Sequence, residues 1–165
     1  MTFREISKPE FTELSPAMFS ILAENMQKLH PDESVTADDL ENWTKWHEKR
    51  FGESIFIVFE SSDALAGYLQ YSLASGCLFV EEIEIAPEYQ RRFGVLGGLF
   101  KYMRRKIPND IVRIAAYINK SNHISRRAAE RLGMCASGEN STGTSLLYED
   151  DISDAFGFCK LRHGE

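Results

Sequence analysis

The 165-residue sequence is poor in cysteine and in residues spaced as metal ligands. Its three cysteines, Cys77, Cys135 and Cys159, stand at long and irregular spacings. Such spacing argues against a disulfide framework and against a CxxC metal site. His30 and His47 also lack a metal-like spacing with each other or with cysteine. We therefore expect reduced thiols, a cytoplasmic protein and no bound metal.

Membrane and nucleic-acid partners have equally little support. No apolar run approaches the roughly 18–20 residues that span a bilayer. The opening Met1-Thr2-Phe3-Arg4-Glu5 lacks the apolar core of a signal peptide. The net charge of -6 does not draw the whole surface to nucleic acid or to an anionic membrane. Any anion-binding site must therefore come from local clusters of Arg and Lys.

The composition does provide enough apolar side chains for one packed core. Hydrophobic residues make up 43% of the chain and aromatic residues 12%, too much for a disordered protein. The length fits a single domain over residues 1–165. We find no internal repeat, low-complexity segment or linker.

Hydrophobic periodicity and turn residues predict an alternation of strands and helices. The expected strands cover residues 2–7, 55–59, 65–73, 78–85, 111–118, 134–136 and 145–148. The expected helices cover residues 9–29, 36–50, 93–106 and 121–132. The order β-α-α-β-β-β-α-β-α-β-β predicts an α/β (α+β) protein, a mixed sheet of about seven strands flanked by about four helices. Its central strand–helix–strand unit predicts a right-handed parallel crossover.

The segment from Pro87 to Gly98, PEYQRRFGVLGG, lies between a predicted buried strand and a helix. Two arginines and three glycines stand where free backbone N–H groups and the helix macrodipole favour an anion. Neither the Gly-Lys-Ser/Thr of a P-loop nor a GxGxxG dinucleotide fingerprint is present. Taken alone, the segment fits either a phosphate site or a glycine-containing turn that packs a helix on a sheet.

This segment resembles the pyrophosphate loop of the GNAT superfamily of acetyl-coenzyme A-dependent N-acetyltransferases, which follows the pattern Gln/Arg-x-x-Gly-x-Gly/Ala. Arg91 and Gly94 match it, whereas Leu96 stands where the family carries a small residue. Downstream, Asn122–Met134 resembles the family's closing motif of Asn, then Ser or Ala, then Glu-Lys-Leu-Gly-Phe. The resemblance covers residues 54–148 and, more weakly, the first two helices.

The resemblance implies a GNAT-like, mostly antiparallel twisted sheet. It also implies an enzyme that moves the acetyl group of acetyl-coenzyme A onto an amine of a small molecule or protein, by direct attack in a ternary complex. Acetyl-coenzyme A would be the co-substrate, and small GNAT-like domains often form homodimers. The implied coenzyme-binding residues are Ile83, Ile85, Gln90, Arg91, Arg92, Phe93, Gly94, Val95, Leu96, Gly97, Asn122, Ser125 and Arg126. Basic residues at Lys120, Arg126, Arg127 and Arg131 either meet the 3′-phosphate or form an ordinary solvated helix face.

Acetyl transfer to an amine needs a proton acceptor. A lysine-like amine is only about one part in a thousand neutral at pH 7, and a positioned base removes the proton of the remainder. Glu82 is the first candidate and Glu84 the second, because strand alternation puts both on the face opposite Ile83 and Ile85. The alternative is a solvated acidic strand end that attracts a cationic substrate. A backbone N–H near Ile85 is expected to polarise the thioester carbonyl.

The proton donor for the leaving thiolate has several candidates in the sequence. Many GNAT enzymes use a Tyr seven residues after the motif's Asn, and this chain has Ala129 there. Water, Tyr148, Tyr117 or Cys135 could replace it, and the absence resembles the branch that acetylates ribosomal-protein N-termini. Leu96 and Ala129 also fit a non-catalytic acyl-coenzyme A-binding module of the same fold. A structural or interaction domain without a coenzyme site is a third hypothesis.

Overall fold

A computed structural model describes residues 1–62, 64–90 and 94–155 of the chain. Its contacts divide the chain into two compact units. The N-terminal unit holds residues 1–71 and 82–95, and the C-terminal unit holds residues 72–81 and 96–165. The expected single domain over residues 1–165 stays a prediction.

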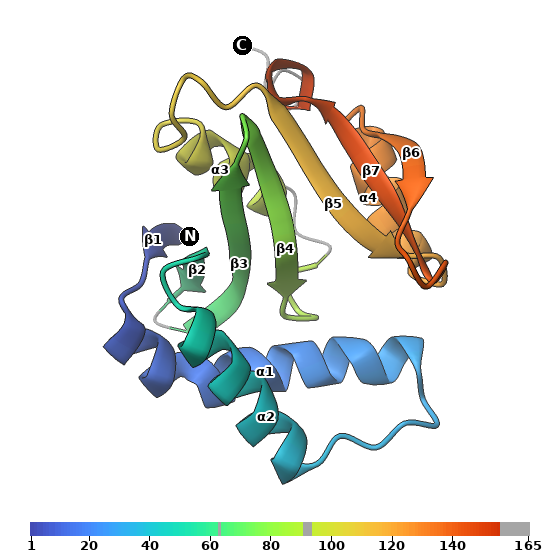
Figure 1. Ribbon diagram of the computed structural model, residues 1–165. Coiled ribbons are helices and arrows are strands. Elements are labelled where there is room, and N and C mark those ends of the chain that lie inside the picture. Colours follow the sequence, from blue (N-terminus) through green and yellow to red (C-terminus); the bar gives the residue numbers. More distant parts are fainter. Residues whose placement is uncertain (63, 91–93, 156–165) are drawn as a thin grey trace. The chain divides into compact units, whose positions relative to one another are not determined.

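The order of helices and strands is the predicted one, and Figure 1 labels them. They are β1 (Thr2–Glu5), α1 (Lys8–Leu29), α2 (Ala37–Arg50), β2 (Ile55–Ser61), β3 (Ala64–Ala74), β4 (Cys77–Ile85), α3 (Val95–Met103), β5 (Arg113–Asn119), α4 (His123–Arg131), β6 (Cys135–Glu139) and β7 (Ser145–Asp151). The hydrogen-bonded strand order is β1-β2-β3-β4-β5-β7-β6. β4 pairs with β5 in parallel, and the β1–β2, β2–β3, β5–β7 and β6–β7 ladders are antiparallel. These features confirm the predicted mixed sheet and the α/β fold class.

Helix α1 begins and ends where the sequence predicts. Glu10 accepts hydrogen bonds from the backbone N–H of Ser7 at 2.8 Å and from its hydroxyl at 2.7 Å, which closes the first turn. Pro16 lies inside the helix and removes the N–H that would bond to the carbonyl of Thr12. The hydroxyl of Ser15 donates to that carbonyl at 3.0 Å instead. The helix therefore continues through the proline.

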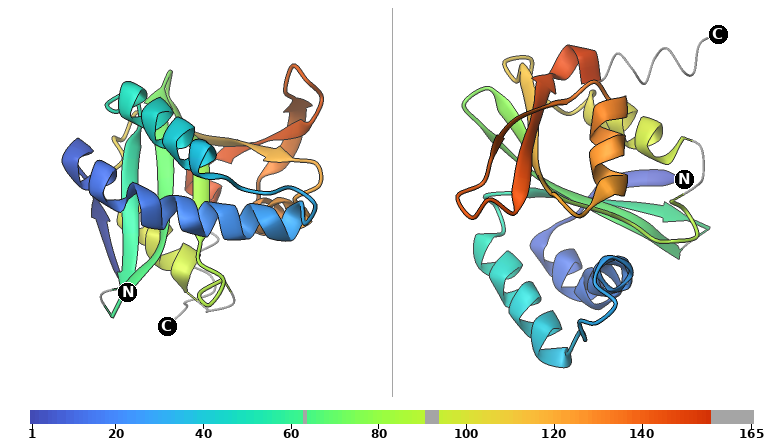
Figure 2. Two further views of the ribbon diagram at one scale, coloured as in Figure 1. Left: turned by 90° about the horizontal axis from the view of Figure 1, so that it is seen from below. Right: turned by 90° about the vertical axis from the view of Figure 1, so that its right-hand side faces the viewer.

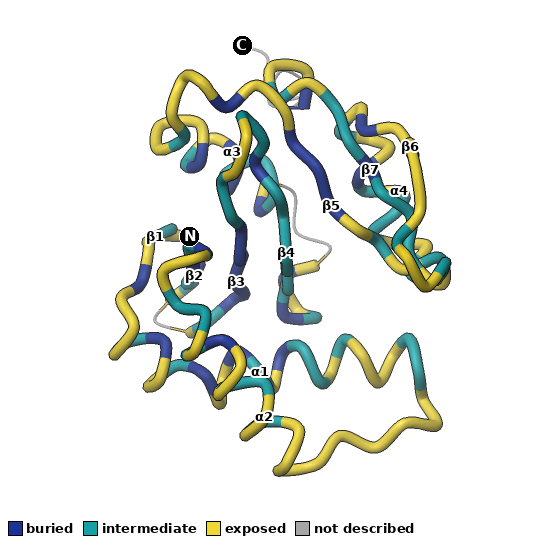
Figure 3. Tube along the Cα trace, viewed as in Figure 1, coloured by how far each residue is buried: buried dark blue, intermediate teal, exposed yellow. Residues whose placement is uncertain are grey.

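The core of the N-terminal unit forms where α1 meets the sheet. Phe11 and Met18 of α1 pack with Phe56 of β2 and Tyr68 of β3, and all four side chains are buried. Burial of each such side chain stabilises the fold by about 1.5–3 kcal/mol. Trp43 of α2 packs against this core and is partly buried. The core thus fixes both helices against β2 and β3. The buried stretch of β3 is dark blue in Figure 3.

Gly67 in β3 allows the end of β4 to approach closely. A Cβ atom on Gly67 would lie 2.2 Å from the carbonyl oxygen of Glu84 and 2.3 Å from the ring of Phe59. Beyond β4, the backbone N–H of Ala86 donates to the carbonyl of Ala66 at 2.9 Å. A residue larger than glycine would therefore push away the strand end that carries the two candidate bases.

The C-terminal unit contains the β5–β7–β6 ladder, and α4 runs alongside β7 (Figures 1 and 2). Asn122 caps α4, since its side-chain oxygen accepts a hydrogen bond from the backbone N–H of Ser125 at 3.0 Å. Gly133, with a φ of +95°, ends the helix as predicted. The β4–β5 pairing covers Cys77–Val80 and Arg113–Ala116.

β6 and β7 are longer than the sequence predicts. The expected pair covered residues 134–136 and 145–148, and the observed strands reach Glu139 and Asp151. Polar and glycine residues in the 137–144 segment are typical of a loop, so they carry no strand signal. The β6–β7 register shifts between Ala136 and Gly138, which accommodates the extension. β6 is exposed along its whole length.

Candidate active site

Glu82 and Glu84 point to the side of β4 that carries the helices of the N-terminal unit. Glu84 contacts Asn25 of α1, and Glu82 contacts His47 of α2 and Tyr68 of β3. The two carboxylates therefore share one face, as strand alternation predicts. Neighbouring Ile83 and Ile85 are half-buried.

Glu82 is held by a buried tyrosine. The hydroxyl of Tyr68 donates a hydrogen bond to Oε1 of Glu82, and the tyrosine side chain is fully buried. Burial and then the charge of Glu82 raise the pKa of Tyr68 well above its usual value of 10. The hydroxyl consequently keeps its proton at neutral pH and stays a donor. The side chain of Glu82 is 18% exposed.

His47 lies on the other side of Glu82. Its Nε2 atom is 3.7 Å from Oε2 of Glu82, and its side chain is 3% exposed. Burial, with a smaller contribution from Arg50, lowers the pKa of His47 to about 4. The imidazole is therefore neutral at pH 7, and the approach to Glu82 is not an ion pair. Its Nδ1 and the indole nitrogen of Trp43 are buried without a partner among the residues that the structure describes.

Glu84 has the proton affinity of a base that works at neutral pH. Burial and the charge of Glu82 raise the pKa of Glu84 to about 7, against the opposing hydrogen bond from Asn25. That hydrogen bond joins Nδ2 of Asn25 to Oε2 of Glu84 at 2.5 Å. Glu84 can therefore accept or release a proton near pH 7.

Asn25 and Gln90 extend this network to the end of β4. Nδ2 of Asn25 also donates to the carbonyl of Ile85 at 3.1 Å. Nε2 of Gln90 donates to Oδ1 of Asn25 at 2.7 Å and to the carbonyl of Ile85 at 2.9 Å. Gln90 was predicted to bind the coenzyme, and its side chain is engaged in this network. The coenzyme role of its backbone stays a prediction.

Sequence reasoning missed Asn25, His47 and Tyr68 as parts of the site. His47 was considered only as a metal ligand, and a single Asn on a helix or a single Tyr on a strand gives no sequence signal. His47 follows Trp43 by four residues on α2, and their ring centres are 4.5 Å apart. That helical spacing was the available signal that His47 faces the interior.

The predicted pyrophosphate loop is only partly described. Arg91, Arg92 and Phe93 lie outside the described residues. Gly94 has a φ of +95°, and a Cβ atom there would meet nothing within 4 Å. α3 begins at Val95, and the backbone N–H groups of a helix's first turn have no partner within the helix itself. A glycine directly before a helix start is the local geometry that an anion site needs.

The predicted coenzyme residues of the C-terminal unit take part in local hydrogen bonds. The guanidinium of Arg126 donates to the hydroxyl of Tyr148 at 3.2 Å and to the carbonyl of Lys120 at 3.1 Å. Tyr148 is buried, and its hydroxyl donates to Glu130 at 3.0 Å. Lys120 pairs with Glu139 at 2.8 Å. These contacts join α4 to β7, and the coenzyme and acid roles of Arg126 and Tyr148 stay predictions.

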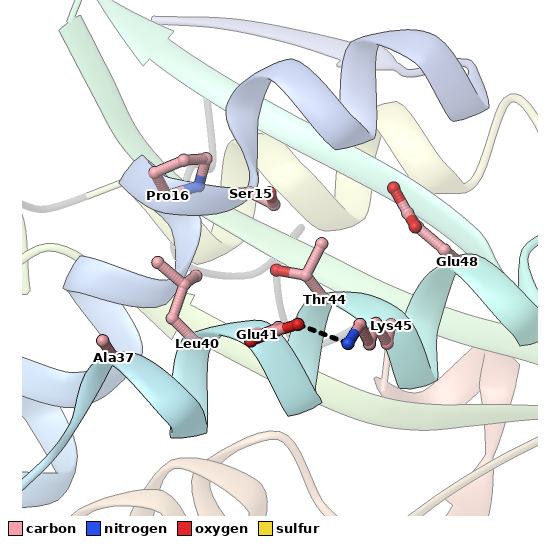
Figure 4. Close-up of a pocket in the computed structure, with 8 residues that line it drawn as sticks. All are labelled: Ser15, Pro16, Ala37, Leu40, Glu41, Thr44, Lys45 and Glu48. Atoms are coloured by element: carbon pink, nitrogen blue, oxygen red, sulfur yellow. Dashed lines mark hydrogen bonds and ion pairs between the residues drawn. The ribbon is translucent and has the colours of Figure 1, made fainter.

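A groove of about 390 Å³ lies between α1 and α2 (Figure 4). It is lined by Ser15, Pro16, Ala37, Leu40, Glu41, Thr44, Lys45 and Glu48. Glu41 and Lys45 form an exposed ion pair with each other, and Glu48 accepts a hydrogen bond from the hydroxyl of Thr12 at 2.6 Å. The carboxylates of the groove are thus engaged by side chains of the two helices, and Glu84, whose pKa is raised to about 7, is not among the lining residues.

Metal ligands and membrane spans have no support in the described ranges. These ranges contain no group of three or more His, Cys, Asp and Glu residues that could hold a metal ion. None of their helices combines the length and the hydropathy needed to cross a bilayer. Cys77 and Cys135 are free thiols, and Cys159 lies outside the described residues.

Several solved structures have a similar fold. A PaiA N-acetyltransferase from Thermoplasma acidophilum in complex with coenzyme A is 14% identical, with a TM-score of 0.67 over 91% of this chain and 98% of that one. An acetyltransferase from Thermus thermophilus is 13% identical, with a TM-score of 0.71 over 92% and 97%. A ribosomal-protein-alanine N-acetyltransferase from Brucella melitensis is 18% identical, with a TM-score of 0.62 over 92% and 99%. At these identities the likeness shows the fold.

The sequence itself was also compared with known proteins. No curated protein matches it. Residues 15–134, more than half of the chain, match the family described as Acetyltransferase (GNAT) family. This match includes the Arg91–Gly94 loop, the Asn122–Met134 motif and the strand that carries the two glutamates. The chain belongs to the acetyltransferase (GNAT) family.

Proposed function

We propose that the protein transfers the acetyl group of acetyl-coenzyme A to an amine within a ternary complex, with Glu84 as the proton acceptor. The observation that carries this proposal is the half-buried carboxylate of Glu84, whose pKa is raised to about 7 beside a second carboxylate. A base with a pKa near the working pH is the most effective one for deprotonating an amine. Membership of the GNAT family supplies the acyl donor.

The coenzyme is proposed to bind at the start of α3. Open space at Gly94 and the free N–H groups of the first turn support a pyrophosphate there. Arg91 and Arg92 would add charge-assisted contacts. Asn122, Ser125 and Arg126 are assigned to the coenzyme by the family motif. The coenzyme A complex of the Thermoplasma neighbour is in accord with this co-substrate.

Glu82 and Glu84 would have different roles in the reaction. Tyr68 donates a hydrogen bond to Oε1 of Glu82. The charge of Glu82 in turn raises the pKa of Glu84. Glu84 takes one proton from the ammonium, and the neutral nitrogen then attacks the thioester carbonyl. The carbon–sulfur bond breaks, and the second proton of the nitrogen passes through water to the leaving thiolate. This assigns the base to Glu84 rather than to Glu82, the first candidate from the sequence.

The acceptor is proposed to be a cationic amine in its resting state. Two carboxylates on one strand face attract positive charge. The base then removes one proton from the amine, which frees the nitrogen lone pair for the attack. The backbone N–H near Ile85 is proposed to polarise the thioester carbonyl. Water is proposed to protonate the leaving thiolate, because the hydroxyl of Tyr148 is engaged by Glu130 and Arg126.

A non-catalytic acyl-coenzyme A-binding module is the second candidate, favoured by Leu96 and Ala129. Thermal unfolding with coenzyme A and thiol release with a panel of amines separate the two. We expect coenzyme at 100 times its Kd to stabilise the protein by about 2.7 kcal/mol. Binding without thiol release on any amine would favour the module. Unchanged unfolding at millimolar coenzyme would contradict both.

Gly94→Glu tests the coenzyme loop. The new carboxylate should repel the pyrophosphate and weaken coenzyme binding by about 100-fold or more. Gly52→Glu is a matched control, since Gly52 also has a positive φ, +105° against +95°, and also has open space around its Cβ position. We expect the control to bind coenzyme as the wild type does. Equal affinities for the two variants, measured by titration calorimetry, would place the pyrophosphate elsewhere.

A further inference from the structure

The side chain of Asn25 makes three hydrogen bonds at the end of β4, two donated and one accepted. Its Nδ2 donates to Oε2 of Glu84 at 2.5 Å and to the carbonyl of Ile85 at 3.1 Å. Its Oδ1 accepts from Nε2 of Gln90 at 2.7 Å. Gln90 also donates to the carbonyl of Ile85, at 2.9 Å. One amide on α1 thus joins the strand end, the candidate base and the start of the next loop.

The chemistry of the partners fixes the orientation of this amide. A carboxylate and a carbonyl are acceptors, so they require the NH₂ end of Asn25. The NH₂ of Gln90 is a donor, so it requires the oxygen end. A flipped Asn25 would face acceptors with its oxygen and a donor with its NH₂. Only one rotamer state of the amide therefore satisfies all three neighbours.

We infer that Asn25 is a positioning residue, which holds the Glu84 carboxylate in place for the amine and ties it, through Gln90, to the segment that leads into the predicted pyrophosphate loop. The inference rests on the proposed function for its catalytic meaning. Because Asn25 engages Oε2, we assign Oε1 of Glu84 to the amine proton. Asn25 itself takes no part in the chemistry.

The same hydrogen bond sets the proton affinity of the base. Among the residues that the structure describes, the ionisable groups recorded around Glu84 are Glu82 on its own strand, Tyr68 of β3 and, beyond Glu82, His47 of α2. Glu82 and burial raise the pKa of Glu84, and the Asn25 hydrogen bond lowers it. Without Asn25, Glu84 would hold its proton at neutral pH and could not accept one from the amine.

The test is a carbon-13 NMR titration of glutamate side chains in the full-length protein. The resonance of Glu84 is the one lost in Glu84→Gln. We expect its midpoint to move up by about one pH unit in Asn25→Leu. In Asn25→Asp, which keeps the size of the side chain, a second carboxylate should move the midpoint up by at least as much. Gln90→Leu should give a smaller upward shift.

Asn140→Leu is the matched control. Asn140 also makes a local amide network, with Thr142, Thr144 and the backbone of Ser145, at 2.9 to 3.1 Å. We expect this variant to leave the Glu84 midpoint unchanged. An unchanged or lower midpoint in both Asn25 variants would overturn the inference, as would a shift of equal size in the control.

Activity gives a second readout. With an accepted amine, Asn25→Leu should lower kcat about tenfold at pH 7 and recover most of it near pH 8.5, with little change in the KM for the coenzyme. A uniform loss across pH would indicate a merely structural role. The NMR titration needs no substrate, so an absence of acetyl transfer in the wild type would contradict the proposed function without deciding the inference.

Discussion

The two units of the protein each bury a tyrosine whose hydroxyl donates to a glutamate, and the surroundings of the two glutamates differ. In the C-terminal unit, Tyr148 donates to Glu130 and accepts a hydrogen bond from the guanidinium of Arg126. In the N-terminal unit, Tyr68 donates to Glu82, and the next charged neighbour along the strand face is another carboxylate, Glu84.

This difference separates a cluster whose charge is compensated from one that we propose to be reactive. In the C-terminal unit, the guanidinium of Arg126 compensates the charge of Glu130. The hydrogen bond to Tyr148 and the charge of Glu130 raise the pKa of Arg126. A second carboxylate instead raises the pKa of Glu84 to about 7. The same pair of residue types therefore stabilises the fold in one unit and, with Glu84 beside it, favours proton transfer in the other.

Removing the carboxylate at the reactive end should have the largest effect. Glu84→Gln cannot accept a proton, so we expect kcat at pH 7 to fall by about 10²–10⁴-fold, and to rise again at high pH where the free amine is more abundant. Glu130→Gln, the matched change in the C-terminal unit, should leave kcat within about threefold. Both values are measured by thiol release with an accepted amine.

The comparison of these two variants can fail in a clear way. If Glu84→Gln keeps wild-type kcat while Glu82→Gln loses it, the base is Glu82, the first candidate from the sequence. Similar losses in Glu84→Gln and Glu130→Gln would remove the distinction between the two clusters.

The next largest difference is expected between the variants that remove the two tyrosine hydroxyls. Tyr68→Phe deprives the half-buried Glu82 of its donor, so we expect a loss of about 1–2 kcal/mol in the free energy of unfolding and a changed pH profile of kcat. Tyr148→Phe leaves Arg126 and Glu130 able to compensate each other, so we expect a loss of about 1 kcal/mol and an unchanged profile. A tenfold lower kcat in Tyr148→Phe would assign it the acid role that the sequence suggested.

The smallest expected effect is on the pH dependence of the free energy of unfolding. His47 is neutral when folded because its pKa of about 4 lies below the unfolded 6.5, so its contribution is present above pH 6.5 and is lost as the pH falls to 4. Glu84 has a folded pKa of about 7 against 4.5 unfolded, so its contribution is present below pH 4.5 and is lost as the pH rises to 7. The two effects oppose each other and largely cancel in the wild type.

Single variants should separate these two contributions. Relative to wild type, His47→Phe should become less stable as the pH rises from 4 to 6.5, by about 2 kcal/mol after allowance for solvent screening. Relative to wild type, Glu84→Gln should become more stable as the pH rises from 4.5 to 7, by a similar amount. Urea unfolding at each pH measures both. Parallel curves for wild type and both variants would contradict the two pKa displacements.

Much of the fold could be predicted from local patterns. Periodicity and turn residues predicted helices α1 and α2, and strand alternation placed Glu82 and Glu84 on one face. The extent of β6 could not be predicted, because its polar residues form a strand only through their pairing with β7. Local propensity says nothing about a partner strand.

The sequence by itself determined the order of the elements, the family and the strand that carries the candidate bases, because periodicity, caps and motifs are properties of neighbouring residues. Only the tertiary structure showed that Glu84 has a raised pKa, on which we propose it as the base. The pKa of Glu84 depends on burial, on the charge of Glu82 and on Asn25, which lies 59 residues away in the chain. Proton affinity is set by what surrounds a group in space, and folding alone brings those surroundings together.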